Sequence, residues 1–300
     1  MKQKFFKRLA AAAVLLLSAA TASAHDFEVN GIYYRINSDN TSVSVTYRGG
    51  LYYSYDNEYS GTVTIPTSVT YSGKTYSVTD IVSYAFRECS GLESVEIPNS
   101  VTSIGDSAFY GCSGLKKVEI FDLEAWCKIS FRGRSYAANP TYYSHNLFLN
   151  GQEIKNLIIP ETVQELKSYA FAGCSGLTSV VIPNSVTSIG DWAFYECSGL
   201  KSVSIGNSVT KIYEHAFYEC SGLESITVES GNTVYDSRDN CNALIKTATN
   251  ELLLGCKNTI IPNSVTSIGN DAFRNCSGLT SIVIPNYVTS IGNSAFSYCI

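Results

Sequence analysis

The chain has 300 residues, of which 45% are apolar or aromatic and 16% are charged, with a formal net charge of −5 at pH 7. This composition predicts a globular protein rather than a disordered one. The 26 acidic residues outnumber the 21 basic ones, and the basic footprint of a nucleic-acid-binding protein is absent, so no nucleic acid is expected as a partner.

Residues 1–24 have the features of a secretory signal peptide. The first eight residues include three lysines and Arg8, and an apolar stretch follows over 9–20. Small residues then lead to Ala24, as at a signal-peptide cleavage site. The apolar stretch is too short to span a bilayer, and no later segment has the roughly 20 apolar residues of a transmembrane helix. We expect cleavage near Ala24 and a secreted or surface-displayed protein, with a net charge of −9 after the loss of four basic residues.

Residues 25–65 lack the pattern that fills the rest of the chain. Apolar residues alternate over 27–29, 32–36 and 43–47, with a turn-rich link between the second and third stretches. This alternation predicts short antiparallel strands. We interpret the segment as an N-terminal β cap that covers the next unit, because an open strand edge promotes aggregation.

From residue 66 onward the chain is built from one repeated unit. The pattern Ala-Phe, two residues, Cys occurs seven times, 23 residues apart wherever nothing intervenes, and ends at Cys89, Cys112, Cys174, Cys197, Cys220, Cys276 and Cys299. A fixed period of this length is typical of a solenoid, in which each coil needs its neighbours to bury its apolar face. Residues 66–300 are therefore predicted to form a solenoid.

One regular coil runs from Pro183 to Ile205. The LxxVxI pattern at its end predicts a short parallel strand. Pro183 is expected to end the preceding strand, because proline has no amide hydrogen to donate. The stretch from Ala193 to Leu200 predicts a helical turn, with Gly199 available for a positive φ.

Three stretches exceed the period and are interpreted as insertions, near 71–79, 122–156 and 231–258. Insertions in a solenoid form loops or hairpins on its faces, because the stacked core tolerates none. In the third, a hairpin that pairs Lys246 with Glu251 would set Cys241 opposite Cys256. A disulfide there and two buried free thiols are both compatible with this placement.

The coil sequence IPNSVTSIGDxAFxxCSGLxSV, as in Ile182 to Val203, closely resembles the BspA-like leucine-rich repeat family over about residues 60–300. The leader and the DFEVNGIYYRI segment are similar to the start of secreted members from gut and oral Bacteroidetes. The resemblance implies a right-handed leucine-rich-repeat solenoid that is secreted or surface-exposed and serves in adhesion and ligand binding. It implies no enzyme activity.

The seven cysteines in phase are predicted to form a column of small buried thiols that pack as apolar side chains. Adjacent coils would place their Cβ atoms about 4.8 Å apart, longer than the roughly 3.8 Å of a disulfide. No CxxC or clustered Cys and His spacing occurs, so neither a metal site nor a cofactor is expected.

Aromatic side chains supply the main candidate binding surface. They form two rows on the helical turns, one ahead of the Ala and one after the Phe of the repeat, made of Tyr84, Tyr169, Trp192 and His215, and of Tyr110, Tyr195 and Tyr218. Such rings stack on sugars or anchor protein contacts, unless they only cover the coil edges. A second candidate is the outward strand face with its row of serines, which otherwise is simply a solvated strand.

Catalytic candidates are scarce. After the expected mature terminus at His25 the chain contains only His145 and His215, and Cys127 has no spacing signature that pairs it with His145. We therefore predict a monomeric, non-enzymatic exported scaffold that binds extracellular proteins or glycans of a host or of microbes. The alternative is a purely architectural envelope or stalk component whose specificity lies in a C-terminal region beyond Ile300.

Overall fold

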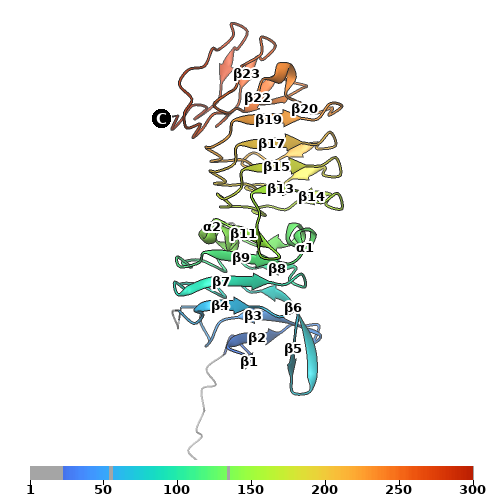
Figure 1. Cartoon of the computed structure of the whole chain (residues 1–300), viewed down its shortest axis with the longest axis vertical. Coiled ribbons are helices and arrows are strands. Elements are labelled where there is room, and N and C mark those ends of the chain that lie inside the picture. The colour runs from blue at the N-terminus through green and yellow to red at the C-terminus, as the bar shows by residue number, and fades with distance from the viewer. Residues whose placement is uncertain (1–22, 54–56, 134–135, 300) are drawn as a thin grey trace, which may run out of the picture.

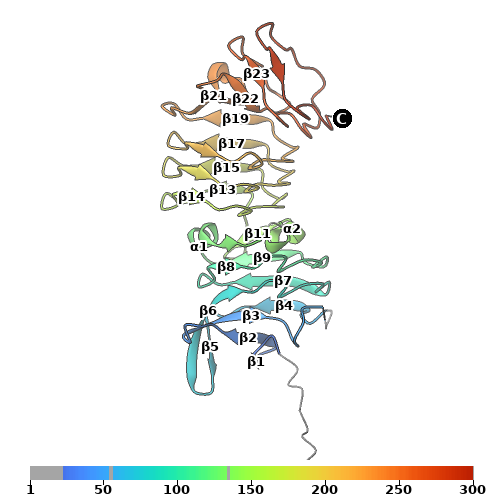
Figure 2. The same cartoon turned by 180° about the vertical axis from the view of Figure 1, so that it is seen from behind.

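Strands of successive coils lie one above another along the long axis of the molecule, as Figure 1 shows. The computed structural model describes residues 23–53, 57–133 and 136–299, so nearly all of the predicted signal peptide lies outside the described residues. The cap strands and the last coils lie at opposite ends of the rod in both views (Figures 1 and 2). Coils that are far apart in the sequence therefore lie far apart along the axis of the rod.

The N-terminal end is a small antiparallel sheet. Its strands are β1 (Phe27–Val29), β2 (Ile32–Ile36) and β3 (Ser42–Thr46). Tyr34 lies opposite Phe27 on one side and Val45 on the other, as the alternation predicted. β3 then pairs in parallel with β6 (Lys74–Ile81), which continues the sheet into the solenoid.

One face of the solenoid carries the strands that the LxxVxI pattern predicted, in two parallel runs. The first run contains β4 (Gly61–Thr64), β7 (Leu92–Ile97), β9 (Lys117–Ile120) and β11 (Leu147–Leu149), with β12 (Gln152–Glu153) antiparallel at its edge. The second contains β13 (Asn156–Ile158), β15 (Ser179–Ile182), β17 (Ser202–Ile205) and β19 (Ser225–Val228). β15 ends directly before Pro183, as expected of a residue without an amide hydrogen.

The other face carries very short parallel strands from the SVTSI part of the repeat. After β6 come β8 (Ser103–Ile104) and β10 (Ser130–Phe131). A second group contains β14 (Glu165–Leu166), β16 (Ser188–Ile189) and β18 (Lys211–Ile212). At the C-terminal end β22 (Glu251–Leu254) is followed by β23 (Ser267–Ile268) and β24 (Ser290–Ile291).

The three long stretches form local elements, as insertions do. β5 (Ser68–Tyr71) and β6 make a hairpin that projects from the rod (Figure 1). The second stretch contains α1 (Leu123–Lys128), η1 (Tyr136–Ala138) and α2 (Thr141–Ser144). The third contains β20 (Tyr235–Asp236), η2 (Arg238–Asn240), β21 (Leu244–Lys246) and β22.

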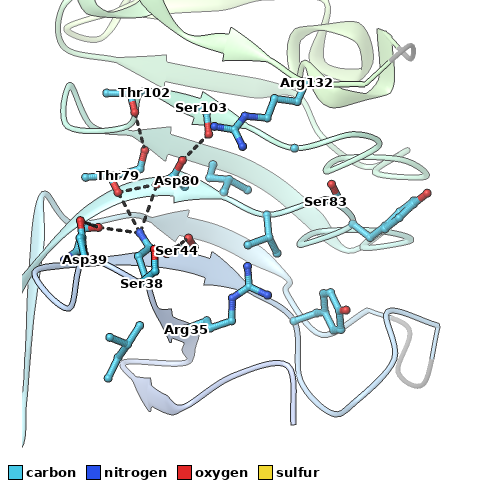
Figure 3. Close-up of a pocket in the computed structure, with 18 of the residues that line it drawn as sticks. Arg35, Ser38, Asp39, Ser44, Thr79, Asp80, Ser83, Thr102, Ser103 and Arg132 are labelled. Carbon is cyan, nitrogen blue, oxygen red and sulfur yellow. Dashed lines mark hydrogen bonds between the residues drawn. The ribbon is translucent and has the colours of Figure 1, made fainter. Parts of the chain in front are cut away.

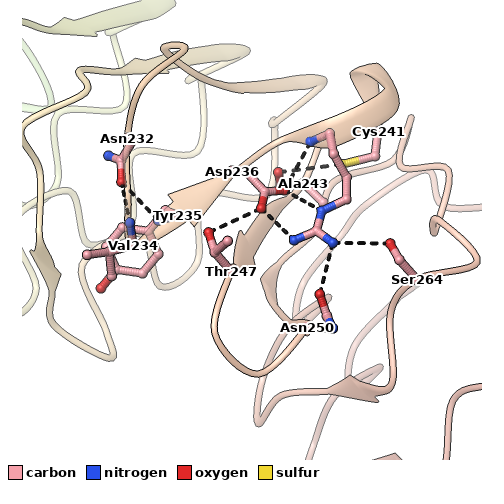
Figure 4. Close-up of polar contacts among 10 residues, drawn as sticks. Asn232, Val234, Tyr235, Asp236, Cys241, Ala243, Thr247, Asn250 and Ser264 are labelled. Carbon is pink, nitrogen blue, oxygen red and sulfur yellow. Dashed lines mark hydrogen bonds and ion pairs between the residues drawn. The ribbon is translucent and has the colours of Figure 1, made fainter.

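Polar side chains hold the third insertion in place (Figure 4). Arg238 donates through Nε and Nη2 to both carboxylate oxygens of Asp236, at 2.7 and 2.5 Å, and through Nη1 to Asn250 at 2.9 Å and Ser264 at 3.3 Å. Burial acts to raise the pKa of Asp236, but the hydrogen bonds from Arg238 hold it below its usual value. The hairpin of β21 and β22 is thereby tied to the coil that follows it.

A column of phenylalanine rings forms the centre of the core. Phe171, Phe194 and Phe217 are fully or almost fully buried, and consecutive ring centres lie 5.4 and 5.2 Å apart with nearly parallel planes. Phe86 and Phe109 stack in the same way at 4.8 Å. These regular contacts follow from coils of equal length, because equal length keeps equivalent side chains in register.

The column has two interruptions, so Phe109 and Phe171 lie in separate runs. The second insertion has Ala137 and Ala138 where other coils have Ala and Phe, and Phe109 N donates to Ala137 O. In the third insertion Gly255 takes the place of Phe, and a Cβ there would lie 2.1 Å from the Phe273 ring. Irregular coils therefore keep the backbone contacts while they lose the ring.

The cysteine column consists of free thiols, as predicted. Four of these thiols donate to the carbonyl of the Phe in the preceding coil: Cys112 to Phe86 at 3.0 Å, Cys197 to Phe171 at 3.2 Å, Cys220 to Phe194 at 3.1 Å and Cys299 to Phe273 at 3.0 Å. Burial raises the pKa of Cys174 to about 12. Cys174 is therefore a packed, protonated thiol at neutral pH.

The possible disulfide between Cys241 and Cys256 does not form, and both are buried free thiols. Lys246 does lie opposite Glu251, as predicted, but a bulge between Leu244 and Ile245 shifts the register further along the hairpin. Cys241 Sγ donates instead to Ala243 O, and Cys256 Sγ to Asn242 O.

Gly199 also differs from its prediction, because its φ is not positive. The left-handed residue of that turn is Glu196, with a φ of 53°. Gly199 provides space instead: a Cβ there would lie 2.1 Å from Ser175 O of the preceding coil, and one at Gly222 would lie 2.3 Å from Ser198 O. The glycine of the CSGL motif thus permits the close approach of neighbouring coils.

Candidate functional site

The turn around Ala-Phe sets the direction of the aromatic side chains. The residue ahead of Ala is left-handed at Tyr84, Tyr169 and Trp192, with φ values of 63°, 63° and 58°. A bulky residue with positive φ is uncommon and costs about 1–3 kcal/mol. Ser107 and Asp271 adopt the same conformation at the same position, whereas His215 does not, so the conformation recurs with different side chains in most of the turns.

Six rings gather on this edge of the solenoid, and we call them the aromatic ridge. They are Tyr136, Tyr142, Trp192, Tyr195, His215 and Tyr218. Trp192 stacks on His215 with ring centres 4.4 Å apart and planes 10° apart, and it meets Tyr195 edge-on at 4.9 Å. Asp191 Oδ1 accepts from the backbone N of His215 and lies 3.2 Å from its Nδ1, which orients the imidazole.

The ridge extends through an arginine at its C-terminal end. The Arg274 guanidinium lies 5.1 Å from the Tyr218 ring centre and 4.8 Å from that of Tyr298. Asp271 and Glu219 lie 3.6 and 4.0 Å from its nitrogens. The arginine therefore links two coils whose rings do not touch, through cation–π contacts.

The structure brings together only part of the predicted rows. Trp192, His215, Tyr195 and Tyr218 meet in the ridge. Tyr84 instead stacks on Tyr52, with ring centres 4.1 Å apart, and Tyr110 is exposed with the Arg87 guanidinium 5.9 Å from its ring centre. Tyr169 packs against the core. The second insertion separates Tyr110 from Tyr195, so the rows are not continuous along the rod.

Tyr136 and Tyr142 were missed by the sequence reasoning. Their rings lie 4.1 Å apart, and Tyr136 lies 5.4 Å from Tyr195. The signal was the pair Ala137 and Ala138, which stands where the other coils have Ala and Phe and places neighbouring tyrosines on the same edge. The insertion therefore fills the ridge at the point where the regular repeat stops.

A groove of about 640 Å³ runs beside the ridge. Its lining repeats from coil to coil and consists of His145, Ser175, Glu196, Ser198, Glu219, Ser221, Asn275, Ser277 and Tyr298. Burial and the neighbouring Glu196 raise the pKa of Glu219. Burial and Glu196 also raise the pKa of Tyr195, so its hydroxyl stays protonated at neutral pH. The groove thus offers hydroxyl donors and carboxylate acceptors next to aromatic faces.

A larger hollow of about 940 Å³ lies at the N-terminal end, and Figure 3 shows its polar lining. Asn37 Nδ2 donates to Ser42 and Thr79, and Ser103 donates to Asp80 at 2.5 Å. The hollow is lined by the cap, by β6 and β8 and by Arg132 after β10. We call this site the polar hollow.

A smaller pocket of about 330 Å³ opens beside the third insertion. Phe217, Leu244 and Leu254 form part of its apolar wall, and Glu219 and Arg274 are among its charged lining. This pocket therefore shares residues with the end of the ridge.

Cys127 and His145, the two residues considered as a catalytic pair, lie in different environments. Burial raises the pKa of Cys127 in α1 to about 12, so it is a protonated thiol, whereas His145 is exposed with Nδ1 3.3 Å from Gly173 O. Within the described residues no three His, Cys, Asp or Glu side chains gather as metal ligands. The same residues include no helix long and apolar enough to cross a membrane.

Comparison with known proteins identifies the family. A family model described as BspA type leucine rich repeat region matches in six copies, over residues 53–137, 141–254 and 253–300. The chain therefore belongs to the BspA-type leucine-rich repeat family, which confirms the resemblance found in the sequence.

Solved structures agree with this assignment. A leucine rich cell surface protein from Faecalibacterium prausnitzii A2-165 is 29% identical, with coverage of 91% of this chain and 74% of that chain and a TM-score of 0.60. The pneumococcal vaccine antigen PcpA is 18% identical, with 91% and 68% covered and a TM-score of 0.50, a likeness that shows the fold alone. Neither is named as an enzyme, and no curated protein matches the chain.

Proposed function

We propose that this protein is an exported, non-enzymatic scaffold that binds extracellular proteins or glycans through its aromatic ridge. The observation that supports the proposal most directly is the gathering of six rings from two distant parts of the sequence on one edge of a leucine-rich-repeat solenoid. The family assignment and the likeness to a cell surface protein agree with display outside the cell.

The division of the chain that we propose rests on the repeat pattern of the sequence and on the pairing of the strands. Residues 1–24 act as a signal peptide cut near Ala24, residues 25–65 cap the rod, and residues 66–300 form a right-handed solenoid with a 23-residue coil. The pairing of Ser179 with Ser202 and of Ser202 with Ser225 supports that coil length. The scaffold acts as a monomer without a cofactor.

The ridge and the groove contact different parts of the same ligand. Aromatic faces stack on the apolar face of a sugar ring or on side chains of a protein, and tyrosine and tryptophan are enriched at binding hot spots. The Glu196 and Glu219 carboxylates and the serine row of the groove then hydrogen-bond the hydroxyl or amide groups of the same ligand. The two surfaces together favour an amphipathic ligand such as a glycan chain.

Replacing Trp192 by alanine is expected to weaken binding at least tenfold, because it removes the ring that contacts His215, Tyr195 and Tyr218. A loss of that size corresponds to about 1.4 kcal/mol, within the range of an aromatic hot spot. The measurement is an array of glycans and matrix proteins probed with the wild type and the variant. Tyr287→Ala is the matched control, because Tyr287 is 68% exposed and lies outside the ridge.

If Trp192→Ala leaves every array signal intact, the ridge is not the binding surface. If the wild type binds nothing on the array, the proposal gives way to the architectural alternative, an envelope or stalk component. Equal losses in the Trp192 and Tyr287 variants would also contradict the assignment of binding to this edge.

A further inference from the structure

A ladder of backbone hydrogen bonds joins the short strands on one face of the solenoid, and this ladder stops at β18. In the regular coils the residue after each short strand donates its N–H to the preceding coil, as at Gly190 to Leu166 O and Tyr213 to Ile189 O. Within the described residues no such bond reaches Ile212 O, the next carbonyl of the series. The ladder resumes only in the third insertion, beyond β18. β18 is therefore an open strand edge in the middle of the rod.

The interrupted ladder leaves an apolar side chain uncovered. Ile104 and Ile189 occupy the same place in other coils and are 0% exposed. Ile212 is partly exposed and lines the pocket of about 330 Å³ beside the third insertion, which we call the insertion pocket. The buried Phe217 and Leu244 line it as well. The pocket therefore takes the place of the apolar side chain that a further short strand would carry.

The second insertion shows how the chain covers a similar break elsewhere. β10 is the last strand of its run, and there the Trp126 ring from α1 meets the Phe131 ring edge-on at 5.5 Å, which leaves Phe131 6% exposed. At β18 the hydroxyl of Tyr235 accepts from Ile212 N at 3.1 Å. The amide of Ile212 is thus satisfied. Its carbonyl is directed at the following coil, as the equivalent carbonyl of Ile189 is, and stays available to a donor.

The charged lining of the insertion pocket is mainly acidic. It consists of four carboxylates and two cations, from Glu214, Glu219, Glu251, Asp271, Lys246 and Arg274. Arg274 lies 3.6 Å from Asp271 and 4.0 Å from Glu219, so its charge is already shared between two carboxylates. Glu214 is exposed, and within the described residues no cation lies within 4.0 Å of it. The excess of carboxylates favours a ligand with positive charge beside its apolar part.

We propose that β18 and the insertion pocket bind an extended segment of an extracellular partner protein, in which lysine or arginine flanks an aliphatic residue. The segment adds a strand to β18 and donates an N–H to Ile212 O. Its aliphatic side chain enters the pocket next to Ile212, and its basic side chain pairs with Glu214. In this mode of binding main-chain hydrogen bonds give affinity, and the side-chain pocket gives specificity. The inference goes beyond the function proposed for the ridge and does not depend on it.

The repeat of the chain itself supplies the probe. Residues 186–190 fill the equivalent place beside β14, where Thr187 N donates to Gln164 O at 2.8 Å and Gly190 N to Leu166 O at 2.9 Å. A fluorescent peptide with the sequence Lys-Val-Thr-Ser-Ile-Gly-Lys carries this segment between two lysines. Titration with the mature chain, followed by fluorescence anisotropy, is expected to show saturable binding. The absence of saturable binding would overturn the proposal.

Two changes in the peptide separate the two contacts without altering the protein. Sarcosine in place of glycine removes the N–H that is expected to bond to Ile212 O. Alanine in place of isoleucine removes the side chain that is expected to enter the pocket. Each change should weaken binding at least tenfold. Unchanged affinity of the sarcosine peptide would exclude strand addition, and unchanged affinity of the alanine peptide would exclude the pocket, so either result would refute the inference.

Glu214→Lys tests the charge of the site. The variant is expected to bind the lysine-flanked peptide at least fivefold more weakly, and to prefer a peptide with glutamate at both ends, because the charge at the pocket is reversed. Glu161→Lys is the matched control, since Glu161 is also exposed and lies outside the lining of the pocket. Its affinity for the peptide should match the wild type. Equal losses in the two variants would mean a general effect of net charge and would contradict the site.

Trp192→Ala separates this inference from the function proposed for the ridge. The variant should bind the peptide as the wild type does, because Trp192 lies outside the lining of the insertion pocket. Glu214→Lys should in turn keep the array signals that depend on the ridge. Loss of peptide binding in Trp192→Ala would place the peptide on the ridge and contradict the inference. Failure of the ridge proposal alone would leave the peptide titration unchanged.

Discussion

Replacing Phe194 by alanine is expected to lower the free energy of unfolding by about 3–5 kcal/mol, the usual cost of removing a buried phenylalanine. The Phe194 ring is fully buried between Phe171 and Phe217, with ring centres 5.4 and 5.2 Å away. A cavity at this point removes stacking contacts to two coils at once. Denaturant unfolding of the wild type and the variant measures the change.

Phe121→Ala is the control for this experiment. Phe121 is 50% exposed and lies outside the column, so its loss should change the free energy of unfolding by only about 0.5 kcal/mol. Similar losses at Phe121 and Phe194 would show that the rings do not form a shared interior.

A second large effect is expected for Gly199→Ala, which should lower the free energy of unfolding by about 1–3 kcal/mol because overpacking forces neighbouring backbone apart. The added Cβ would lie 2.1 Å from Ser175 O, a backbone atom that cannot move without shifting its coil. The same denaturant experiment detects the loss.

Gly91→Ala gives the matched comparison, because Gly91 occupies the same CSGL position in the first coil. Its neighbour there is the cap, and a Cβ at Gly91 would lie 3.3 Å from the Ser60 Cβ. The alanine should therefore be much better tolerated at Gly91 than at Gly199. An equal cost at the two positions would mean that close coil approach does not explain the glycine.

The core could be predicted from the sequence because a solenoid converts a repeated spacing into repeated contacts. Phe194 and Cys197 recur every 23 residues in the regular coils, and their burial follows once neighbouring coils stack in register. The position of Trp192 and Tyr195 on one edge followed from the same argument.

The remaining features depend on local irregularities that carry no periodic signal. The bulge between Leu244 and Ile245 moved the predicted partner of Cys241 out of register. Tyr136 and Tyr142 joined the ridge because an irregular coil keeps the backbone contacts of a regular one. The polar hollow is lined by both Arg35 and Arg132, which are far apart in the sequence. The parallel pairing of the cap with the first coils places both residues at this end of the rod.

Acrylamide quenching of tryptophan fluorescence tests the ridge most directly, because the chain has two tryptophans in opposite environments. Trp126 is 1% exposed, with its Nε1 bonded to Ala170 O, whereas Trp192 is half-buried on the ridge, so acrylamide reaches Trp192. With the strongest binder from the array bound, quenching is expected to fall severalfold. Unchanged quenching at saturation with that binder would contradict binding at the ridge.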